Sequence, residues 1–221
     1  MTSQQRTEPL AAFTPDSRIL FQGDSITDGN RGRSADPNHI LGHGYAFIIA
    51  AKHGAAFPER KLVFLNRGIS GNKVTDLEAR WQRDTLELKP DLLSILIGVN
   101  DTGRAPLEIF EPTYDKLLTE TKTANPSVRF VLLEPFCLPV GHTLERGEAW
   151  VAELTERRKI TARLAKKHGA VLVPCQHVFT EACKRASADY WIWDGIHPTY
   201  SGHQLLADTW VEAVRKAKWG K

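Results

Sequence analysis

The sequence predicts a three-layer α/β/α sandwich built around a five-stranded parallel sheet. Short apolar runs recur along the chain, each apolar at nearly every position, and longer segments with helical periodicity separate them. Strands that are apolar throughout belong to sheets covered on both faces, and alternation with helices indicates parallel strands. Five such repeats indicate a doubly wound, flavodoxin-like sandwich, because a closed eightfold barrel needs more strands and usually more residues.

Each predicted element follows from a local pattern. The strands are predicted where short runs are apolar, at residues 18–21, 61–65, 91–97, 128–133 and 170–173. Helices are predicted where apolar residues recur at helical spacing, at residues 45–56, 74–88, 107–123, 147–167, 178–187 and 200–217.

Charged residues in two of these helices are predicted to face solvent. In the helix at 74–88 the apolar face is formed by Leu77, Trp81 and Leu88. The opposite, solvent-facing side is expected to carry Glu78, Arg80 and Arg83. The densest basic runs, at residues 157–159 and 166–167, are also expected to form a solvated helix face.

Composition limits the organisation and the partners of the chain. Residues 16–221 are predicted to form one domain, because no linker or repeat interrupts them, and the polar residues 1–15 are predicted to form an N-terminal arm. The net charge of +3, with interspersed charges, does not indicate a nucleic-acid partner. No run approaches the roughly 18 apolar residues of a membrane span, and no apolar signal core is present, so a cytoplasmic location is predicted.

The three cysteines do not indicate a disulfide framework or a metal site. Their number is odd and their spacing is irregular. Cys175, His177 and Cys183 could be considered as metal ligands, but no CxxC pair or HxxxH partner completes such a set. We therefore predict a protein without a metal centre.

A candidate nucleophile and base follow from where the strands end. Ligands of an open parallel sheet bind beyond the carboxyl ends of its strands, and Gly23-Asp24-Ser25 follows the first strand. A serine hydroxyl needs a base to take its proton. Among the eight histidines the candidate base is His197, because Asp194 stands three residues earlier, across a glycine, at a spacing that lets its carboxylate orient the imidazole. The alternative interpretation is a turn serine, a turn aspartate and a surface histidine.

The next two strand ends supply candidate donors for an oxyanion. These donors are the backbone N–H groups of Ser25 and Gly71 and the side-chain amide of Asn100. A residue without a Cβ lets its amide approach a ligand closely, which suits Gly71. A simple turn glycine and a helix N-cap are the alternative roles of Gly71 and Asn100.

Four sequence blocks together resemble the SGNH hydrolases, also called the GDSL esterase/lipase family. They occur in order as GDSI at 23–26, NRGISG at 66–71, GVND at 98–101 and DGIH at 194–197. The resemblance runs from about residue 18 to residue 213, and the isoleucine in the first block replaces the usual leucine. It implies ester hydrolysis without a metal or cofactor, with Ser25 as nucleophile, His197 as base and Asp194 as its orienting partner. It also implies an oxyanion hole formed by Ser25, Gly71 and Asn100.

Longer stretches are similar to bacterial acetylxylan esterases and related carbohydrate acetylesterases. The stretches are GDSITD, NRGISGNKVTDLEARW, KPDLLSILIGVND and WDGIHPTYSGH. The similarity implies a small ester substrate, an acetylated sugar or xylo-oligosaccharide, and the family also includes homo-oligomers. Two alternatives stay open: an esterase, thioesterase or modest lipase for other small acyl groups, and a non-catalytic carbohydrate-binding scaffold.

Aromatic residues near the histidine block are candidate sugar contacts. Tyr190, Trp191, Trp193 and Tyr200 surround Asp194 and His197 in the sequence. Aromatic faces pack well against sugar rings, so at least one of Trp191 and Trp193 is expected to line the site, and Tyr45 is expected to reach it from the first loop. The alternative is that some of these residues pack the last helix onto the sheet.

Overall fold

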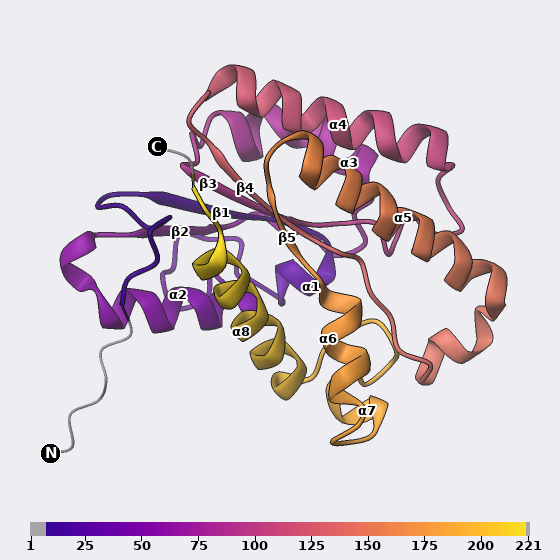
Figure 1. Ribbon diagram of the computed structural model, residues 1–221. Helices are drawn as coiled ribbons and strands as arrows, with labels where there is room; N and C mark the ends of the chain where they lie inside the picture. Colours follow the sequence, from indigo (N-terminus) through magenta and orange to yellow (C-terminus); the bar gives the residue numbers. More distant parts are fainter. Residues whose placement is uncertain (1–7, 220–221) are drawn as a thin grey trace, which may run out of the picture.

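A five-stranded parallel sheet lies at the centre of the computed structural model, which describes residues 8–219 (Figure 1). Its strands are β1 (Arg18–Gly23), β2 (Val63–Asn66), β3 (Leu92–Leu96), β4 (Arg129–Leu133) and β5 (Val171–Val173). The spatial order is β2-β1-β3-β4-β5, and every neighbouring pair is parallel. This is the flavodoxin-like order, and it confirms the fold class predicted from the sequence.

Helices cover both faces of the sheet. The helical elements are α1 (Ser25–Asp28), α2 (Tyr45–Ala56), η1 (Pro58–Arg60), α3 (Val74–Trp81), η2 (Gln82–Leu86), α4 (Leu107–Ala124), η3 (Gly141–Glu145), α5 (Gly147–Lys167), α6 (Cys175–Ala182), α7 (Ala188–Trp191) and α8 (Tyr200–Lys216). Helices α3, α4 and α5 pack on one face and α2, α6 and α8 on the other (Figure 1).

The two faces of the sheet enclose separate hydrophobic cores. Successive strand residues point to opposite faces. In β3, Leu93 and Ile95 therefore join the core beneath α3, α4 and α5, and Leu92 and Leu96 join the core beneath α2 and α8. All five residues of β3 are buried, as expected for a central strand covered on both sides.

Two arginines predicted to face solvent are buried instead. Arg80 on α3 is 9% exposed and Arg157 on α5 is fully buried. Both helices run past the carboxyl edge of the sheet, where loops from neighbouring strands offer backbone carbonyls to their guanidinium groups. The prediction was wrong because helical periodicity does not reveal acceptors that come from distant parts of the chain.

Two predicted helices have different boundaries in the structure. The helix predicted at 74–88 is regular only as far as Trp81 and continues as the π-helical turn η2. The helix predicted at 178–187 begins at Cys175, directly after Pro174, and ends at Ala182. The short helix α7 that follows it, and the turn α1 at Ser25, are absent from the sequence-based prediction.

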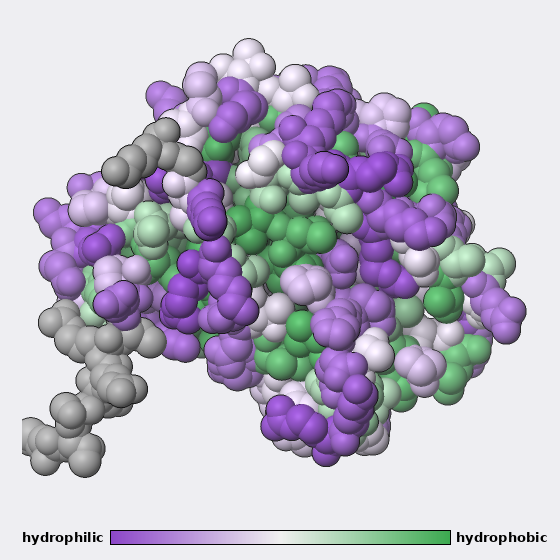
Figure 2. Space-filling view, in the orientation of Figure 1, coloured by the Kyte–Doolittle hydropathy of each residue, from purple (hydrophilic) through white to green (hydrophobic). Residues whose placement is uncertain are grey.

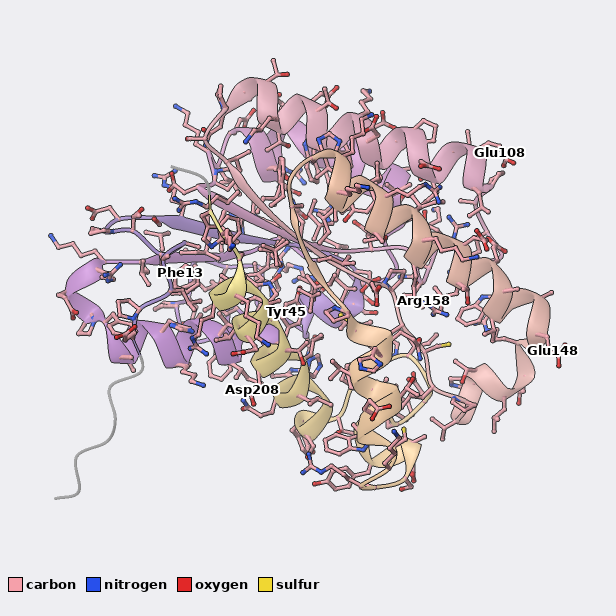
Figure 3. All side chains as sticks on the ribbon, in the orientation of Figure 1. Phe13, Tyr45, Glu108, Glu148, Arg158 and Asp208 are labelled. Carbon is pink, nitrogen blue, oxygen red and sulfur yellow. The ribbon has the colours of Figure 1, made fainter. Side chains whose placement is uncertain are left out.

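The described part of the N-terminal arm packs against the domain. Leu10, Ala12 and Phe13 are buried, and the Phe13 ring lies 5.7 Å from that of Phe64 in β2 and beside α2 (Figure 3). Arg129 of β4 donates a hydrogen bond to the Ala12 carbonyl at 3.1 Å. Residues 1–7 of the predicted arm lie outside the described residues.

A hydrophobic area lies at the centre of the face in Figure 2, where β5 meets α8. A groove there is lined by residues of both elements, among them Val171, Leu172 and Ala213, and by Trp219. None of the helices within residues 8–219 is long and apolar enough to cross a membrane. The three cysteines are free thiols.

Candidate active site

The end of β1 presents Ser25 at the carboxyl edge of the sheet. Gly23 has a φ of +154°, and a Cβ at this position would overlap the Leu96 carbonyl of β3 and the Thr27 side chain. Asp24 then caps α1, accepting a hydrogen bond from the Ile26 N–H at 3.0 Å, and Ser25 is the first residue of this short helix. The sharp strand-to-helix turn therefore needs glycine and aspartate directly before the serine.

Ser25, His197 and Asp194 form one chain of hydrogen bonds. The Ser25 Oγ lies 2.8 Å from the His197 Nε2, and the His197 Nδ1 lies 2.6 Å from the Asp194 Oδ2. The other carboxylate oxygen of Asp194 accepts the backbone N–H groups of Ile196 and His197 at 2.9 and 2.7 Å. The spacing of three residues folds into a turn in which the carboxylate holds both the backbone and the ring of His197.

The electrostatics of this turn favour an ionised Asp194. Burial alone would raise the pKa of Asp194, but the hydrogen bonds from His197 and Ile196 outweigh it and lower the pKa below its usual value. An ionised carboxylate only accepts, so the Nδ1 of His197 carries the proton. The Nε2 is then free to accept the Ser25 hydroxyl proton.

The segment after β4 holds this turn in place. The Leu138 N–H donates to the Gly195 carbonyl and the His142 N–H donates to the Asp194 carbonyl, both at 3.0 Å. Gly195 has a φ of +91°, and a Cβ there would overlap the Val140 carbonyl. The positions of Asp194 and His197 are thus fixed by backbone contacts from a segment more than fifty residues earlier in the chain.

The candidate oxyanion donors lie at neighbouring strand ends. Gly71 follows β2 with a φ of +82°, and Asn100 follows β3. The Asn100 side-chain amide donates to the Asn72 carbonyl at 3.3 Å, which brings the two loops together. An amide group has two N–H donors, so one remains for a ligand.

Arg80 fastens the loops that follow β1 and β2. Its Nε donates to the Asn72 side chain at 2.9 Å, its Nη1 to the Arg67 carbonyl at 2.8 Å, and its Nη2 to the Gly23 carbonyl at 3.4 Å. Sequence reasoning missed this role because it placed Arg80 in solvent. The available signal was its place in the stretch NRGISGNKVTDLEARW, which resembles carbohydrate acetylesterases.

Helix α5 holds the loop that carries Asn100. The Arg157 Nη2 donates to the Asp101 carbonyl at 3.1 Å and to the Ala105 carbonyl, and the Trp150 Nε1 donates to the Thr102 carbonyl at 3.2 Å. Glu153 accepts the Gly103 N–H at 3.0 Å. Residues 150, 153 and 157 share one face of the helix, so a single face of α5 holds residues 101–105.

Two buried aspartates lie close to the candidate nucleophile. Burial raises the pKa of Asp24 to about 7 and that of Asp101 to about 6. Within residues 8–219 each of them has one carboxyl oxygen that is buried without a hydrogen-bond partner. The Asp24 carboxyl is therefore partly protonated near neutral pH, and it interacts electrostatically with both His197 and Asp101.

The aromatic candidates have different environments. Tyr45 is fully buried beside α8 (Figure 3), and its hydroxyl bonds to the Thr27 hydroxyl at 3.0 Å. The expectation that Tyr45 reaches a substrate was therefore wrong, because Tyr45 lies on the side of α2 that packs against the sheet.

Trp191 is 7% exposed and its indole N–H donates to the Ala182 carbonyl at 3.0 Å, so Trp191 is a packing residue. Trp193 is 61% exposed, directly before Asp194.

Within residues 8–219 no three histidine, cysteine or acidic side chains come together as a possible metal site. The groove between β5 and α8 does not include Ser25, Asp194 or His197.

The hydrogen-bonded Ser25, His197 and Asp194 at the carboxyl edge of this flavodoxin-like sheet have the arrangement typical of serine hydrolases. Residues 21–205 match the model of the GDSL-like lipase/acylhydrolase family, and the chain belongs to this family. This confirms the resemblance found in the sequence. The protein is a hydrolase of the esterase and acylhydrolase class.

Relatives with known structures agree with this assignment. An acetylxylan esterase of Geobacillus stearothermophilus is 31% identical over 216 residues, covering 89% of this chain and 93% of the esterase. The crystal structure of Axe2, an acetylxylan esterase from the same organism, matches with a TM-score of 0.80 over 95% of this chain and 99% of that one, at 30% identity. A structure described as a GDSL-like lipase from Parabacteroides merdae matches with a TM-score of 0.86 over 91% and 96% of the two chains, at 39% identity.

Variants of the Geobacillus esterase involve the same residue types. Two of its structures are described as catalytic mutants, one with a serine and one with an aspartate replaced by alanine. In a third, the tryptophan directly before that aspartate is replaced by isoleucine. In this chain Trp193 likewise directly precedes Asp194.

Proposed function

We propose that the protein is a serine esterase that removes short acyl groups, above all acetyl, from acylated sugars such as xylo-oligosaccharides. The observation that carries the proposal is the pair of short contacts, 2.8 Å from Ser25 to His197 and 2.6 Å from His197 to Asp194. A base within hydrogen-bond reach of a serine, itself oriented by a carboxylate, is what acyl transfer to serine requires.

In this mechanism the Ser25 Oγ attacks the ester carbonyl carbon while the His197 Nε2 takes the hydroxyl proton. Asp194 stabilises the imidazolium that forms. The backbone N–H groups of Ser25 and Gly71 and the amide of Asn100 donate to the developing oxyanion. His197 then gives its proton to the departing sugar hydroxyl, leaving an acyl group on Ser25.

Water completes the reaction. His197 takes a proton from the water, whose oxygen attacks the acyl carbonyl, and the carboxylic acid leaves as Ser25 regains its proton. Arg80 and Arg157 act through the loops that they hold, and they are positioning residues in this scheme.

Two observations support a short acyl group and a sugar. Val99, Trp150 and Leu154 form a small buried cluster with Ile196, next in sequence to Asn100 and His197. Val99, Trp150 and Leu154 are already buried, so they offer no open apolar surface to a long acyl chain. The exposed Trp193 offers a flat apolar face beside Asp194, and the similarity to an acetylxylan esterase points to the same substrate class.

The decisive test replaces Ser25 with alanine. The control is a separate variant, Ser127→Ala, which changes an exposed serine far along the chain. We expect hydrolysis of p-nitrophenyl acetate to fall at least about 10³-fold in the first variant and to persist in the second, with both folded by circular dichroism. A fluorophosphonate probe should label only the protein that retains Ser25. Full activity of Ser25→Ala would contradict the proposed nucleophile. Faster hydrolysis of octanoate esters than of acetate esters would contradict the preference for short acyl groups.

A further inference from the structure

Three arginines lie on the loops that follow α1 and β2. Arg31 and Arg33 follow α1, and Arg67 follows β2. Asp28, which is 3% exposed, accepts both terminal nitrogens of Arg33 at 3.1 and 2.6 Å, and it also accepts the backbone N–H groups of Arg31 and Ser70 at 3.0 Å. Burial alone would raise the pKa of Asp28, but these hydrogen bonds outweigh it and lower the pKa. The carboxylate is therefore fully occupied.

Arg31 and Arg67 lack a comparable partner. The Arg31 Nε donates to the Gly68 carbonyl at 2.9 Å, while its two terminal nitrogens bond to nothing within residues 8–219. The guanidinium of Arg67 makes one long contact, 3.5 Å from Nη1 to the Asn66 carbonyl. In the described part of the chain no acidic side chain forms an ion pair with either of them.

Arg31 is held beside Gly68, the residue directly after Arg67 in the sequence, because its Nε donates to the Gly68 carbonyl. Burial, followed by the neighbouring charges of Arg33, Arg67 and Arg80, lowers the pKa of Arg31 to about 10, although the charge of Asp28 acts in the opposite direction. Mutual repulsion of guanidinium groups is unfavourable unless an anion lies between them. Arg80, by contrast, is paired with Asp84 at 3.3 Å.

This cationic group borders the candidate oxyanion donors. Gly68, which Arg31 holds, packs against α1 so closely that a Cβ would overlap the Asp28 N–H. Ser70, directly before Gly71, donates to Asp28 Oδ2, the same oxygen that binds the Nη2 of Arg33. A sugar ester bound at Ser25 would therefore have the arginines beside it, on the β2 side.

We propose that Arg31 and Arg67 form a subsite for an anionic group of the sugar, so that acetylated acidic sugars bind better than neutral ones. The inference rests on the proposed esterase function and names the substrate class of the same site. The planar guanidinium matches a carboxylate through two parallel N–H···O bonds. A phosphate shares this chemistry, and the test therefore includes both anions.

The test compares three acetylated methyl glycosides: a glucoside, the glucuronide that carries a carboxylate in place of the hydroxymethyl group, and the glucoside 6-phosphate. Their affinities for the Ser25→Ala protein are measured by calorimetry. We expect at least one anionic glycoside to bind about tenfold more tightly than the glucoside, with the preference falling as salt rises. Equal affinities of all three would overturn the inference.

Variants locate the subsite. In the Ser25→Ala background, Arg31→Gln and Arg67→Gln should each bring the ratio of anionic to neutral affinity towards one. Arg163→Gln removes the same charge from an exposed arginine that pairs with Glu111 on the outer surface of α5, and it should leave the ratio unchanged. An equal effect of Arg163→Gln would show that net charge, not a subsite, sets the preference.

Kinetics of the unsubstituted protein separate this inference from the proposed function. If neutral and anionic esters are hydrolysed with equal kcat/KM and bound with equal affinity, the proposed subsite is contradicted and the proposed esterase function is supported. If an anionic glycoside is bound preferentially but no ester is hydrolysed, the proposed esterase function is contradicted and the proposed subsite is supported.

Discussion

Two buried arginines hold the two loops that carry the candidate oxyanion donors, and they bond in different ways. Arg80 uses all three of its side-chain nitrogens, with acceptors on Gln22, Arg67, Gly23, Asn72 and Asp84. Arg157 makes its hydrogen bonds through Nη2 alone. Its Nε and Nη1 are buried with no partner in the described part of the chain, and its guanidinium lies 4.7 Å from the centre of the Phe110 ring.

Burial of a polar side chain therefore does not by itself measure its contribution to stability. A buried donor that meets acceptors stabilises, whereas a buried donor without one costs about 1–3 kcal/mol. His53 on α2 extends the comparison, because it is 1% exposed and neither ring nitrogen has a partner within residues 8–219. Arg80 thus has hydrogen bonds on all three of its side-chain nitrogens, Arg157 on one of three and His53 on neither of two.

The largest effect is expected for Arg80→Met. The substitution leaves the side chains of Gln22 and Asn72 and the carbonyl of Arg67 without their donor, so the free energy of unfolding should fall by about 3 to 5 kcal/mol. Ester hydrolysis should fall as well, because the Gly71 loop is released. Denaturant titration and initial rates measure the two effects.

Arg83→Met is the matched control for this prediction. Arg83 pairs with the same aspartate, Asp84, at 2.9 Å, but its side chain is 73% exposed. An exposed ion pair contributes less than about 1 kcal/mol, so this variant should keep its stability. Equal losses in the Arg80 and Arg83 variants would contradict the assignment of the effect to the buried hydrogen bonds.

The sequence predicted the fold and singled out Ser25, Asp194 and His197, which hydrogen bonds join in the structure, but it did not predict the bonding of the buried arginines. Apolar runs identify strands because burial on both faces is a local requirement, and Ser25, Asp194 and His197 stand in short motifs with their own turn chemistry. Arg80 and Arg157 were assigned to solvent because their acceptors are carbonyls of other strand ends. Tyr45 was misplaced for the same reason, since its core contacts come from Phe21 and Thr27.

A second, smaller effect is expected for His53→Phe. His53 packs between the rings of Phe13 and Phe57, and burial lowers its pKa to about 4. Between the unfolded value of 6.5 and about 4, the unfolded chain binds more protons than the folded one. The His53 contribution to stability is therefore present at neutral pH and is lost as the pH falls from about 6.5 to about 4.

The variant should remove this loss. We expect the stability difference between pH 7.5 and pH 5 to shrink by about 2 kcal/mol relative to the unchanged protein. His203, whose pKa burial also lowers to about 4, is present in both proteins and cancels in the comparison. The control His177→Gln changes an exposed histidine of α6 and should leave the pH dependence as it is. An unaltered pH dependence in His53→Phe would show that His53 does not titrate in this way.

The smallest effect is expected for Arg157→Met, although Arg157 is more deeply buried than Arg80. The substitution removes the hydrogen bonds of Nη2 to the Asp101 and Ala105 carbonyls, which is unfavourable, but it also removes two buried nitrogens that lack partners. The methionine retains apolar contact with the Phe110 ring. These opposing contributions should lower the free energy of unfolding by about 1 kcal/mol or less.

Trp150 and Glu153 still hold the Asn100 loop in this variant, so kcat should change less than in Arg80→Met. If Arg157→Met destabilised the protein as much as Arg80→Met in the same denaturant titration, depth of burial rather than the number of satisfied donors would govern how these arginines stabilise the site.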